Sequence, residues 1–491
     1  MGILKELYGT SLTLLTDLYQ ITMAYAYWKS GMADREAVFH MFYRRNPFNG
    51  GYAIACGLDV VIDYLNNFNF DDSDLEYLKT LTGNDGKPLF DLAFLEYLKQ
   101  LKFTCSVDAI PEGTPVFENE PLVRVQGPLL QAQLIETPLL NIINYQTLVA
   151  TKSARICQAA NGAPVMEFGL RRSQGMDGGL AASRAAYIGG CSATSNVLAG
   201  KLFGIPVSGT HAHSWVMSFS NELEAFEKYA AAMENNCILL VDTYDTRQGI
   251  INAIEVGKAL KSRGKKLTGI RIDSGDLAYL SQLAREMFDQ AGLQDTKIVA
   301  SNDLDEYILE SLQDQHAKLD LLGVGTKLVT AYDQPALGGV YKLSALKNGK
   351  GEWESKIKLS EQTIKINIPG IQQIKRFYKS GLMVSDMIYD LEIGHVDEPT
   401  IVDPNDSTKS KKINTNQLES EDLLVPIFKD GKLIYKSPTL SGIRDHVAEG
   451  MSKLHSGIKR FVNPHVYVVG VEQRLFEKRQ RLILEQRKLI S

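Results

Sequence analysis

Residues 238–290 read ILLVDTYDTRQGIINAIEVGKALKSRGKKLTGIRIDSGDLAYLSQLAREMFDQ. The stretch begins with a short apolar run, 238–241, and continues into residues 247–263, whose apolar side chains recur at helical spacing. A second apolar run, 267–272, precedes a second amphipathic segment, 276–290. Short apolar runs that alternate with longer amphipathic ones are typical of parallel strands joined by helices. The stretch therefore predicts an α/β fold.

The same alternation extends in both directions, from about residue 160 to residue 330. Four further apolar runs lie in this region, at 165–166, 205–207, 298–300 and 321–324. Each run ends in small or polar residues, and in a parallel barrel such strand ends carry the chemistry. We expect a parallel α/β barrel, although a doubly wound open sheet would share the pattern. Asp276 and Asp303 are expected to cap helices.

The two flanks follow a different pattern. Before the barrel, an amphipathic helix is expected at 14–28, with β patterns at 39–43 and 107–126. After it, period-two alternation at 355–359 and 363–368 predicts strands, and residues 428–433 carry a hairpin signal. The lysine-rich stretch 403–416 is expected to be an exposed loop.

These patterns predict three segments. Residues 1–150 would form an N-terminal helix and part of a β-rich flanking domain, and residues 151–335 would form the catalytic barrel. Residues 336–491 would return to the flanking domain and end in helices after Pro438 and Glu472. The flanking domain would thus be an α+β domain built from both ends of the chain.

The composition is that of an ordinary globular protein, with 44% hydrophobic and 23% charged residues among 491. Its 53 basic and 58 acidic residues give a net charge of −5, which argues against a general electrostatic footprint for nucleic acid. The five cysteines lie far apart and form no Cys-x-x-Cys pair, so a reducing cytoplasm fits them best. No signal peptide or membrane-spanning segment is indicated.

The run that ends at Glu167 is followed by an aromatic residue and two arginines. The Phe168 ring could stack on a flat heterocycle, and Arg171 could fork onto phosphate or carboxylate. A surface arginine pair above a core phenylalanine is the alternative. Residues 189–196 form a small-residue turn before a helix, which would suit an anion or be a plain tight turn.

Two histidines, His211 and His213, follow Thr210 after the run at 205–207. In extended backbone they would point the same way. They could be structural, a His-x-His metal pair, or nucleophiles or charge stabilisers in phosphate chemistry. None of the other histidines ends a predicted barrel strand, so a zinc site would have only Asp242 and Asp273 as helpers.

Two further strand ends carry groups suited to phosphates. Arg271 and Asp273 share a face if the backbone is extended, and they could meet an anionic substrate and Mg²⁺, or simply pair with each other. Gly325 and Thr326 place a glycine and a hydroxyl where a phosphate could approach the backbone, or mark only a turn. No Walker A sequence occurs, so ATP use would need another kind of site.

Taken together, these motifs resemble the nicotinate phosphoribosyltransferase family. The resemblance runs through residues 15–20, 42–48, 167–179, 195–200, 209–218, 271–277, 323–326 and 337–342. It implies an irregular parallel α/β barrel with a flanking β-rich domain, and a homodimer with sites between subunits. It also implies the ATP-coupled joining of nicotinate to 5-phosphoribosyl 1-pyrophosphate, which gives nicotinate mononucleotide and pyrophosphate in the first step of NAD salvage from nicotinate.

The resemblance also implies residue roles. His213 would be a phosphohistidine that links ATP hydrolysis to the transfer. Tyr19 and Phe168 would sandwich the pyridine ring, with Tyr19 supplied by the neighbouring subunit, while Thr210 and Arg271 would contact nicotinate.

Further roles concern the phosphates and the metal. Arg171 would lie close to the ring and phosphates, and Thr326, beside Gly325, would hold the phosphoribosyl group. Asp242 and Asp273 would be magnesium or ribose ligands. Nicotinamide or quinolinate phosphoribosyltransferase activity, a His-x-His metal-dependent hydrolase and a silent ligand-binding barrel stay open as alternatives.

Overall fold

The computed structural model describes residues 3–361, 366–394 and 397–489, which divide into two compact units. One unit is the continuous segment Val149–Pro335. The other is built from the segments on either side, Met1–Leu148 and Ala336–Ser491. We call them the parallel-sheet unit and the β-rich unit.

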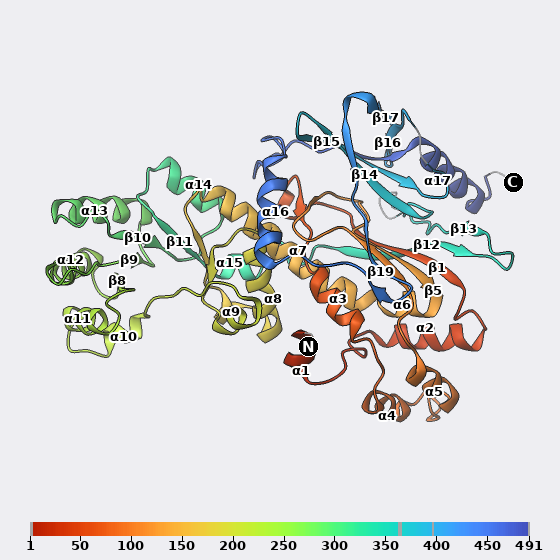
Figure 1. The fold of residues 1–491 in the computed structure, drawn as a ribbon, viewed down its shortest axis with the longest axis horizontal. Helices are drawn as coiled ribbons and strands as arrows, with labels where there is room; N and C mark the ends of the chain where they lie inside the picture. Colours follow the sequence, from red (N-terminus) through yellow and green to blue (C-terminus); the bar gives the residue numbers. More distant parts are fainter. Residues whose placement is uncertain (1–2, 362–365, 395–396, 490–491) are drawn as a thin grey trace. The chain divides into compact units, whose positions relative to one another are not determined.

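The parallel-sheet unit contains six parallel strands in the order β7-β6-β11-β10-β9-β8 (Figure 1). The strands are β6 (Val165–Glu167), β7 (Ala193–Thr194), β8 (Ile238–Leu240), β9 (Gly269–Ile272), β10 (Lys297–Ala300) and β11 (Leu321–Val324). The helices between them are η2 (Leu170–Arg172), α8 (Gly175–Ile188), α9 (Val197–Phe203), α10 (His213–Met217), α11 (Glu222–Ala232), α12 (Thr246–Ser262), α13 (Leu277–Gln290), α14 (Glu306–Asp314) and α15 (Thr326–Val329). The predicted alternation of strands and helices is confirmed.

Helix starts in this unit follow from short polar side chains. Asp276 caps α13 as predicted, since its side chain accepts a hydrogen bond from the Tyr279 amide. The prediction for Asp303 is wrong, because Asp305 caps α14 by accepting from the Ile308 amide. Asn302 and Asp303 have φ values of 96° and 34°, so the chain is still in a left-handed turn there and enters the helix later.

The run at 205–207 is not a strand of this sheet. It makes a single parallel bridge, from Val207 to Thr194, because Pro206 has no amide hydrogen to extend a ladder. The end strand of the sheet beside this run is β7, which lies within residues 189–196, the stretch predicted to be a turn. In the described part of the chain, β7 and β8 are the end strands of the hydrogen-bonded order, so the closed barrel is not confirmed.

The β-rich unit contains two large sheets and a two-stranded one. The seven-stranded sheet has the order β13-β12-β1-β5-β3-β19-β20, and the six-stranded sheet has the order β17-β16-β21-β15-β14-β18. The strands are β1 (Glu36–Tyr43), β2 (Ala53–Ile54), β3 (Ser106–Ala109), β4 (Pro115–Val116), β5 (Val123–Pro128), β12 (Gly339–Lys347), β13 (Trp353–Ser355), β14 (Gln372–Lys379), β15 (Leu382–Asp390), β16 (Thr400–Asp403), β17 (Asp406–Lys412), β18 (Glu419–Asp422), β19 (Val425–Lys429), β20 (Lys432–Leu433) and β21 (Val469–Glu472). β1 pairs antiparallel with β5 and with β12, so both ends of the chain share one sheet.

The helices of the β-rich unit lie on and around these sheets (Figure 1). They are α1 (Ile3–Tyr8), α2 (Leu18–Lys29), η1 (Pro47–Asn49), α3 (Leu58–Asn66), α4 (Asp72–Thr80), α5 (Leu92–Gln100), α6 (Leu129–Leu134), η4 (Thr415–Gln417), α16 (Leu440–Ser452) and α17 (Gln473–Gln486). A long helix, α7 (Glu136–Ala159), runs through the boundary between the two units. The predicted helices after Pro438 and Glu472 are confirmed, capped by Thr439 and Glu472.

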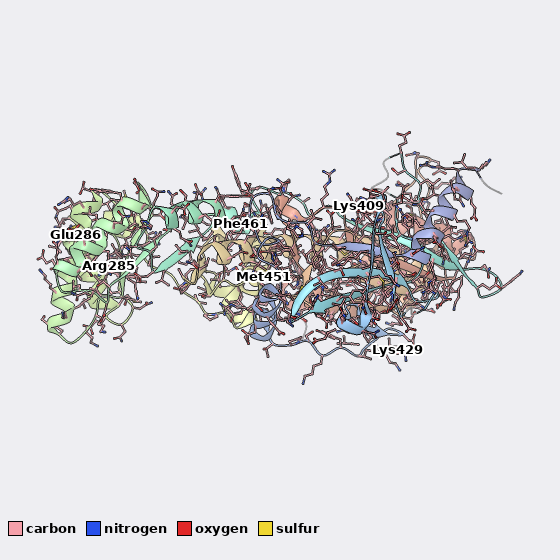
Figure 2. All side chains as sticks on the ribbon, turned by 90° about the horizontal axis from the view of Figure 1, so that it is seen from above. Arg285, Glu286, Lys409, Lys429, Met451 and Phe461 are labelled. Carbon is pink, nitrogen blue, oxygen red and sulfur yellow. The ribbon has the colours of Figure 1, made fainter. Side chains whose placement is uncertain are left out.

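Three expectations for this unit need correction. The helix predicted at 14–28 is α2, which begins at Leu18 and not at residue 14, because Asp17 has extended backbone. Residues 356–359 and 366–368 form no strand, and 363–365 lie outside the described residues. The stretch at 403–416 is largely a hairpin of β16 and β17, whose exposed lysines, such as Lys409, suit a sheet edge (Figure 2).

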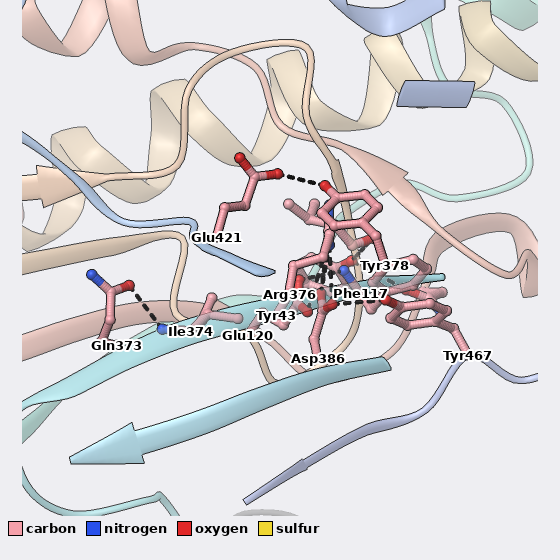
Figure 3. A network of polar contacts seen from close by, with 12 residues as sticks. Tyr43, Phe117, Glu120, Gln373, Ile374, Arg376, Tyr378, Asp386, Glu421 and Tyr467 are labelled. Carbon is pink, nitrogen blue, oxygen red and sulfur yellow. Dashed lines mark hydrogen bonds and ion pairs between the residues drawn. The ribbon is translucent and has the colours of Figure 1, made fainter. Parts of the chain in front are cut away.

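The interior of the β-rich unit holds a charged network (Figure 3). Arg376 on β14 and Asp386 on β15 are both fully buried and form a bidentate pair, with Nη2 to Oδ2 at 2.6 Å. Tyr467 donates to Asp386 Oδ1 at 2.7 Å, and its ring stacks on Phe117 at 3.8 Å. Burial, with the nearby Asp386, raises the pKa of Glu120 well above its usual value. The network is therefore enclosed and shared between strands.

Among residues 3–361, 366–394 and 397–489, no helix has the length and apolar character needed to cross a membrane.

Candidate functional site

A cavity of about 580 Å³ opens at the carboxyl ends of the parallel strands. Its walls come from the loops after β6, β9, β10 and β11 and from the segment before α10. The lining residues are Phe168, Leu170, Arg171, Arg172, Ser195, Gly209, Thr210, His211, Ala212, Arg271, Asp273, Ser301, Asn302, Asp303, Gly323, Gly325 and Thr326. Seven residues proposed from the sequence therefore share one cavity: Phe168, Arg171, Thr210, Arg271, Asp273, Gly325 and Thr326.

The aromatic wall of the cavity is fixed by its neighbours. Glu167 is fully buried, and its carboxylate accepts from the Gly169 amide, from Thr194 Oγ1 at 2.6 Å and from Ser183 Oγ at 2.9 Å. Phe168 follows it and lies against Gly323, where an added Cβ would come within 2.7 Å of the ring. Glycine at 323 thus lets the ring lie flat against β11.

The cationic wall is Arg271, at the end of β9. Its Nη1 donates to Thr210 Oγ1 at 2.5 Å, while its buried Nε has no hydrogen-bond partner among the residues that the structure describes. Burial lowers the pKa of the Arg271 guanidinium, and Arg171 acts in the same direction, although Asp273 and Asp242 oppose them. The guanidinium stays protonated at neutral pH and is poorly compensated, so this wall favours an anionic ligand.

Asp273 is held from two sides. Ser301 donates to its Oδ1, and its own amide donates to Asp242 Oδ2 at 2.9 Å. Ser274 Oγ also donates to Asp242 Oδ2, at 2.6 Å. Asp242 therefore does not line the cavity but orients the turn that carries Asp273. In the described part of the chain, Asp242 Oδ1 is buried without a hydrogen-bond partner.

His213 is the first residue of α10 and lies beside the Asp273 carboxylate. Its Nδ1 is 3.2 Å from Thr243 Oγ1, and its Nε2 is 3.9 Å from Asp273 Oδ2. The His213 side chain is 41% exposed. The imidazole is thus oriented by one hydroxyl and one carboxylate and remains open to a ligand.

His211 has different surroundings. Its Nε2 accepts from the Leu240 amide at 3.2 Å, its Nδ1 is 3.3 Å from Ala212 O, and its ring meets Tyr229 edge to face. Burial lowers the pKa of His211 to about 4. The two rings would point the same way only in extended backbone, and this condition is not met, because the extended backbone ends at Ala212 and His213 begins α10. Both ring nitrogens of His211 are engaged, which argues against a His-x-His metal pair.

Sequence reasoning gave no role in the cavity to three lining residues after β10. Ser301 is 5% exposed and holds Asp273, while Asn302 and Asp303 form the rim with positive φ values. Their place after an apolar run and the tolerance of Asn and Asp for left-handed backbone were the available signals. Tyr19, the remaining proposed residue, belongs to the β-rich unit, where it is 48% exposed near the start of α2.

Carboxylate oxygens are the ligands that could hold a cation here. Asp242 Oδ1 and Asp273 Oδ2 are left over after the hydrogen bonds described above, which suits Mg²⁺ bound mainly by waters and phosphate oxygens. Within the described residues, no group of three or more His, Cys, Asp or Glu side chains could hold a metal ion. An all-protein metal cage is therefore not a feature of this cavity.

Comparisons with known proteins agree along the whole chain. Family models described as the N-terminal domain, the family and the C-terminal domain of nicotinate phosphoribosyltransferase match residues 14–144, 164–360 and 371–479. The nicotinate phosphoribosyltransferase of Bacillus subtilis is 46% identical over 480 residues, which cover 97% of this chain and 96% of that protein. The human protein of that name is 35% identical, with coverages of 94% and 95%.

Solved structures give the same picture. The crystal structure of human nicotinic acid phosphoribosyltransferase superposes with a TM-score of 0.84 at 33% identity, covering 95% of this chain and 99% of that one. A nicotinate-nucleotide pyrophosphorylase from Pyrococcus furiosus gives 0.64 at 21% identity, with coverages of 90% and 96%, and shares the fold.

Proposed function

The chain belongs to the nicotinate phosphoribosyltransferase family, and from that premise we propose how its cavity carries out the reaction. The enzyme joins nicotinate to 5-phosphoribosyl 1-pyrophosphate and forms nicotinate mononucleotide and pyrophosphate, a step of NAD biosynthesis. The observation that carries the assignment of roles is the meeting of an aromatic ring, an undercompensated guanidinium and a carboxylate in one cavity.

Nicotinate is a flat anion. The aromatic wall of the cavity suits its flat ring, and the cationic wall suits its negative charge. We assign the pyridine ring to the face of Phe168 and the carboxylate to Arg271 and Thr210. The Arg271 Nε, which has no hydrogen-bond partner among the described residues, is available to such a carboxylate. We also propose a homodimer in which Tyr19 of the partner subunit covers the other face of the pyridine ring, since Tyr19 is half exposed.

The phosphoribosyl donor would occupy the other end of the cavity. Gly325 and Thr326 offer backbone and hydroxyl donors to its 5-phosphate, Arg171 faces the phosphates, and Asp273 takes a ribose hydroxyl. The pyridine nitrogen attacks C1 of the ribose as the bond to pyrophosphate breaks, so positive charge grows on the sugar and negative charge on the leaving group. Fixed cations near that negative charge lower the barrier, and ring stacking aligns the nitrogen.

Mg²⁺ would be held by the remaining oxygens of Asp242 and Asp273 together with phosphate oxygens. When bound, it would neutralise charge on the pyrophosphate as that group departs. Ser301 and the Asp273 amide hold the two carboxylates in place for this task, and Asp242 Oδ1 is the buried oxygen that such a cation would satisfy.

ATP coupling would run through His213. A ring nitrogen attacks the γ-phosphorus of ATP, the bond to the β–γ bridging oxygen breaks, and ADP leaves with that electron pair. Water later removes the phosphoryl group. Support comes from the exposure of the imidazole and from its contacts with Thr243 and Asp273, which would also let phosphate charge on His213 influence Asp273.

We further propose that the parallel sheet forms an irregular barrel. In the described part of the chain, no ladder of hydrogen bonds joins the end strands β7 and β8. Val207 forms a bridge to β7, and His211 accepts a hydrogen bond from the Leu240 amide of β8. The segment 205–211 therefore contacts both end strands. It contacts β7 through a backbone bridge and β8 through the His211 side chain. Exchange of the Leu240 amide with deuterium should accelerate in His211→Ala; unchanged exchange would contradict this closure.

The reaction is tested by measuring mononucleotide and pyrophosphate formation with nicotinate, nicotinamide and quinolinate, each with and without ATP. We expect turnover of nicotinate, stimulated by ATP, and little of the two competitors. Absence of nicotinate turnover would overturn the assignment, and a preference for nicotinamide would reassign the Arg271 wall.

His213→Ala tests the coupling. We expect basal transfer to remain while ATP stimulation and acid-labile phosphate on the protein are lost. Ser214→Ala changes the next, exposed residue of α10 and is the matched control. ATP stimulation that survives in His213→Ala would contradict the assigned role.

A further inference from the structure

Two cysteines from distant parts of the chain meet in the parallel-sheet unit. Cys157 lies in the last turn of α7, and Cys191 lies between α8 and β7. Their sulfurs are 3.9 Å and 3.4 Å from the same hydroxyl, Ser153 Oγ. Ser153 itself donates to Ala186 O at 2.7 Å, which leaves its oxygen facing the sulfurs.

The backbone around this pair is packed closely. Gly190 has a φ of 125°, and a Cβ added there would lie 3.2 Å from both Cβ and Sγ of Cys157. The chain that carries Cys191 therefore rests directly on the Cys157 side chain. A disulfide requires close approach of two Cβ atoms, and this packing brings the residue next to Cys191 against Cys157.

The two thiols differ in access. Cys157 is partly exposed, whereas Cys191 is fully buried. The hydrogen bond with Cys157, together with burial, raises the pKa of the Cys191 thiol well above its usual value. An oxidant from solvent therefore reaches Cys157 first, and Cys191 is positioned as the resolving thiol.

We propose that Cys157 and Cys191 are a redox modification site, which a peroxide converts to a reversible intramolecular disulfide. The Cys157 sulfur attacks one peroxide oxygen, the O–O bond breaks, and water and a sulfenic acid form. The Cys191 sulfur then attacks the Cys157 sulfur, the S–O bond breaks, and the departing hydroxide takes the Cys191 proton as a second water. The two thiols are oxidised, and one hydrogen peroxide molecule is reduced to two waters.

The disulfide would act on the cavity through β7. We propose that the approach of the sulfurs to about 2.05 Å shifts the turn at 190–192 against the end of α7. Ser192 donates to Val165 O at 2.7 Å, Thr194 holds Glu167, and Ser195 lines the cavity. Movement of the turn should therefore also shift the end of β6 and the Phe168 ring that follows it. We expect slower mononucleotide formation, a consequence that rests on the proposed function.

The test treats the whole protein with hydrogen peroxide, alkylates the remaining thiols under denaturing conditions and digests with trypsin. Cleavage after Arg155, Arg171, Arg184 and Lys201 gives peptides 156–171 and 185–201, which each hold one cysteine of the pair. We expect the two peptides to be linked, and dithiothreitol to separate them. Absence of the linked peptide would overturn the proposal, whatever the catalytic activity of the protein.

Variants and activity sharpen the result. In Cys191→Ser, Cys157 should stop at the sulfenic acid, which dimedone traps, while Cys237 should stay unmodified because it is buried. Peroxide should lower nicotinate turnover of the wild type at least threefold, with recovery in dithiothreitol, and should spare Cys157→Ser. A disulfide that forms without changing turnover would overturn the link to the cavity.

Discussion

Each unit contains an arginine on a strand with an aspartate close by, and the two pairs are used differently. In the β-rich unit, Arg376 and Asp386 are fully buried, and both carboxylate oxygens are engaged, by the arginine and by Tyr467. In the parallel-sheet unit, Arg271 donates to Thr210, and Asp273 keeps one oxygen beside His213 with 29% of its side chain exposed.

The difference shows what separates a charged pair that holds strands together from one that can act on a ligand. Both pairs place a guanidinium and a carboxylate in a largely dry environment, where an unmatched charge is costly. Around Arg376, both oxygens of Asp386 are engaged within an enclosed network, which fixes strands together, although Arg376 Nη1 has no hydrogen-bond partner among the described residues. Partial matching, as around Asp273, keeps hydrogen-bonding capacity that a substrate can satisfy. The predictions below separate these two roles.

The largest effect is expected on stability, from Arg376→Met. Removing the guanidinium leaves Asp386 buried without its counter-ion beside Glu120, which should destabilise the β-rich unit by about 3–5 kcal/mol. Urea unfolding measures this loss. Lys375→Met is the matched control on the same strand, because its ion pair with Asp422 is partly exposed and should contribute under about 1 kcal/mol. Equal losses in both variants would remove the distinction.

Asp273→Asn should affect chemistry and spare stability. The amide keeps the size of the side chain but removes the charge facing His213, so kcat should fall roughly 10²- to 10³-fold. Thermal unfolding should shift by under about 1 kcal/mol. Asp276→Asn is the control in the same loop, since asparagine caps a helix as well as aspartate does. A large stability loss with normal turnover would mean that Asp273 is structural.

Gly323→Ala should act on one substrate. The new methyl group meets the Phe168 ring at 2.7 Å and must tilt it, so KM for nicotinate should rise about tenfold, equal to about 1.4 kcal/mol. KM for the phosphoribosyl donor should change less. Gly349→Ala, where an added Cβ meets no atom within 4 Å among the described residues, serves as control. Equal changes in both KM values would point to general distortion.

The smallest effect is a pH dependence of stability from His211. Its pKa is about 4 in the folded protein, against 6.5 when exposed, so the unfolded chain binds more protons between these values. This contribution is present above pH 6.5 and is lost as pH falls toward 4. His211→Gln should flatten the slope of unfolding free energy across this window. A slope that persists unchanged would assign it to other groups.

Sequence patterns predicted the parallel strands well because both faces of such strands are buried, which makes each run continuously apolar. They failed at 205–207, where an apolar run contains Pro206 and makes one bridge. They also failed at β17, where an edge strand rich in lysine and serine has the composition of a loop. Composition reports burial, and β17 is exposed along nearly its whole length.

The candidate site was predictable to a similar extent. Phe168, Arg271 and Thr326 were found because parallel strand ends gather at one edge of a sheet. The direction of a side chain was not predictable, since the start of α10 between His211 and His213 turns them apart. The hold of Ser301 on Asp273 depends on register between β9 and β10, which no local pattern encodes.

The two-part construction of the β-rich unit has a consequence for synthesis on the ribosome. β1 can pair with β5 early, but its other edge waits for β12, whose Leu346 lies opposite Ala37. The continuous segment Val149–Pro335 is complete before that partner strand has emerged. The inserted unit can therefore fold first, while an unpaired apolar strand stays exposed, so chaperone demand should peak between these two events.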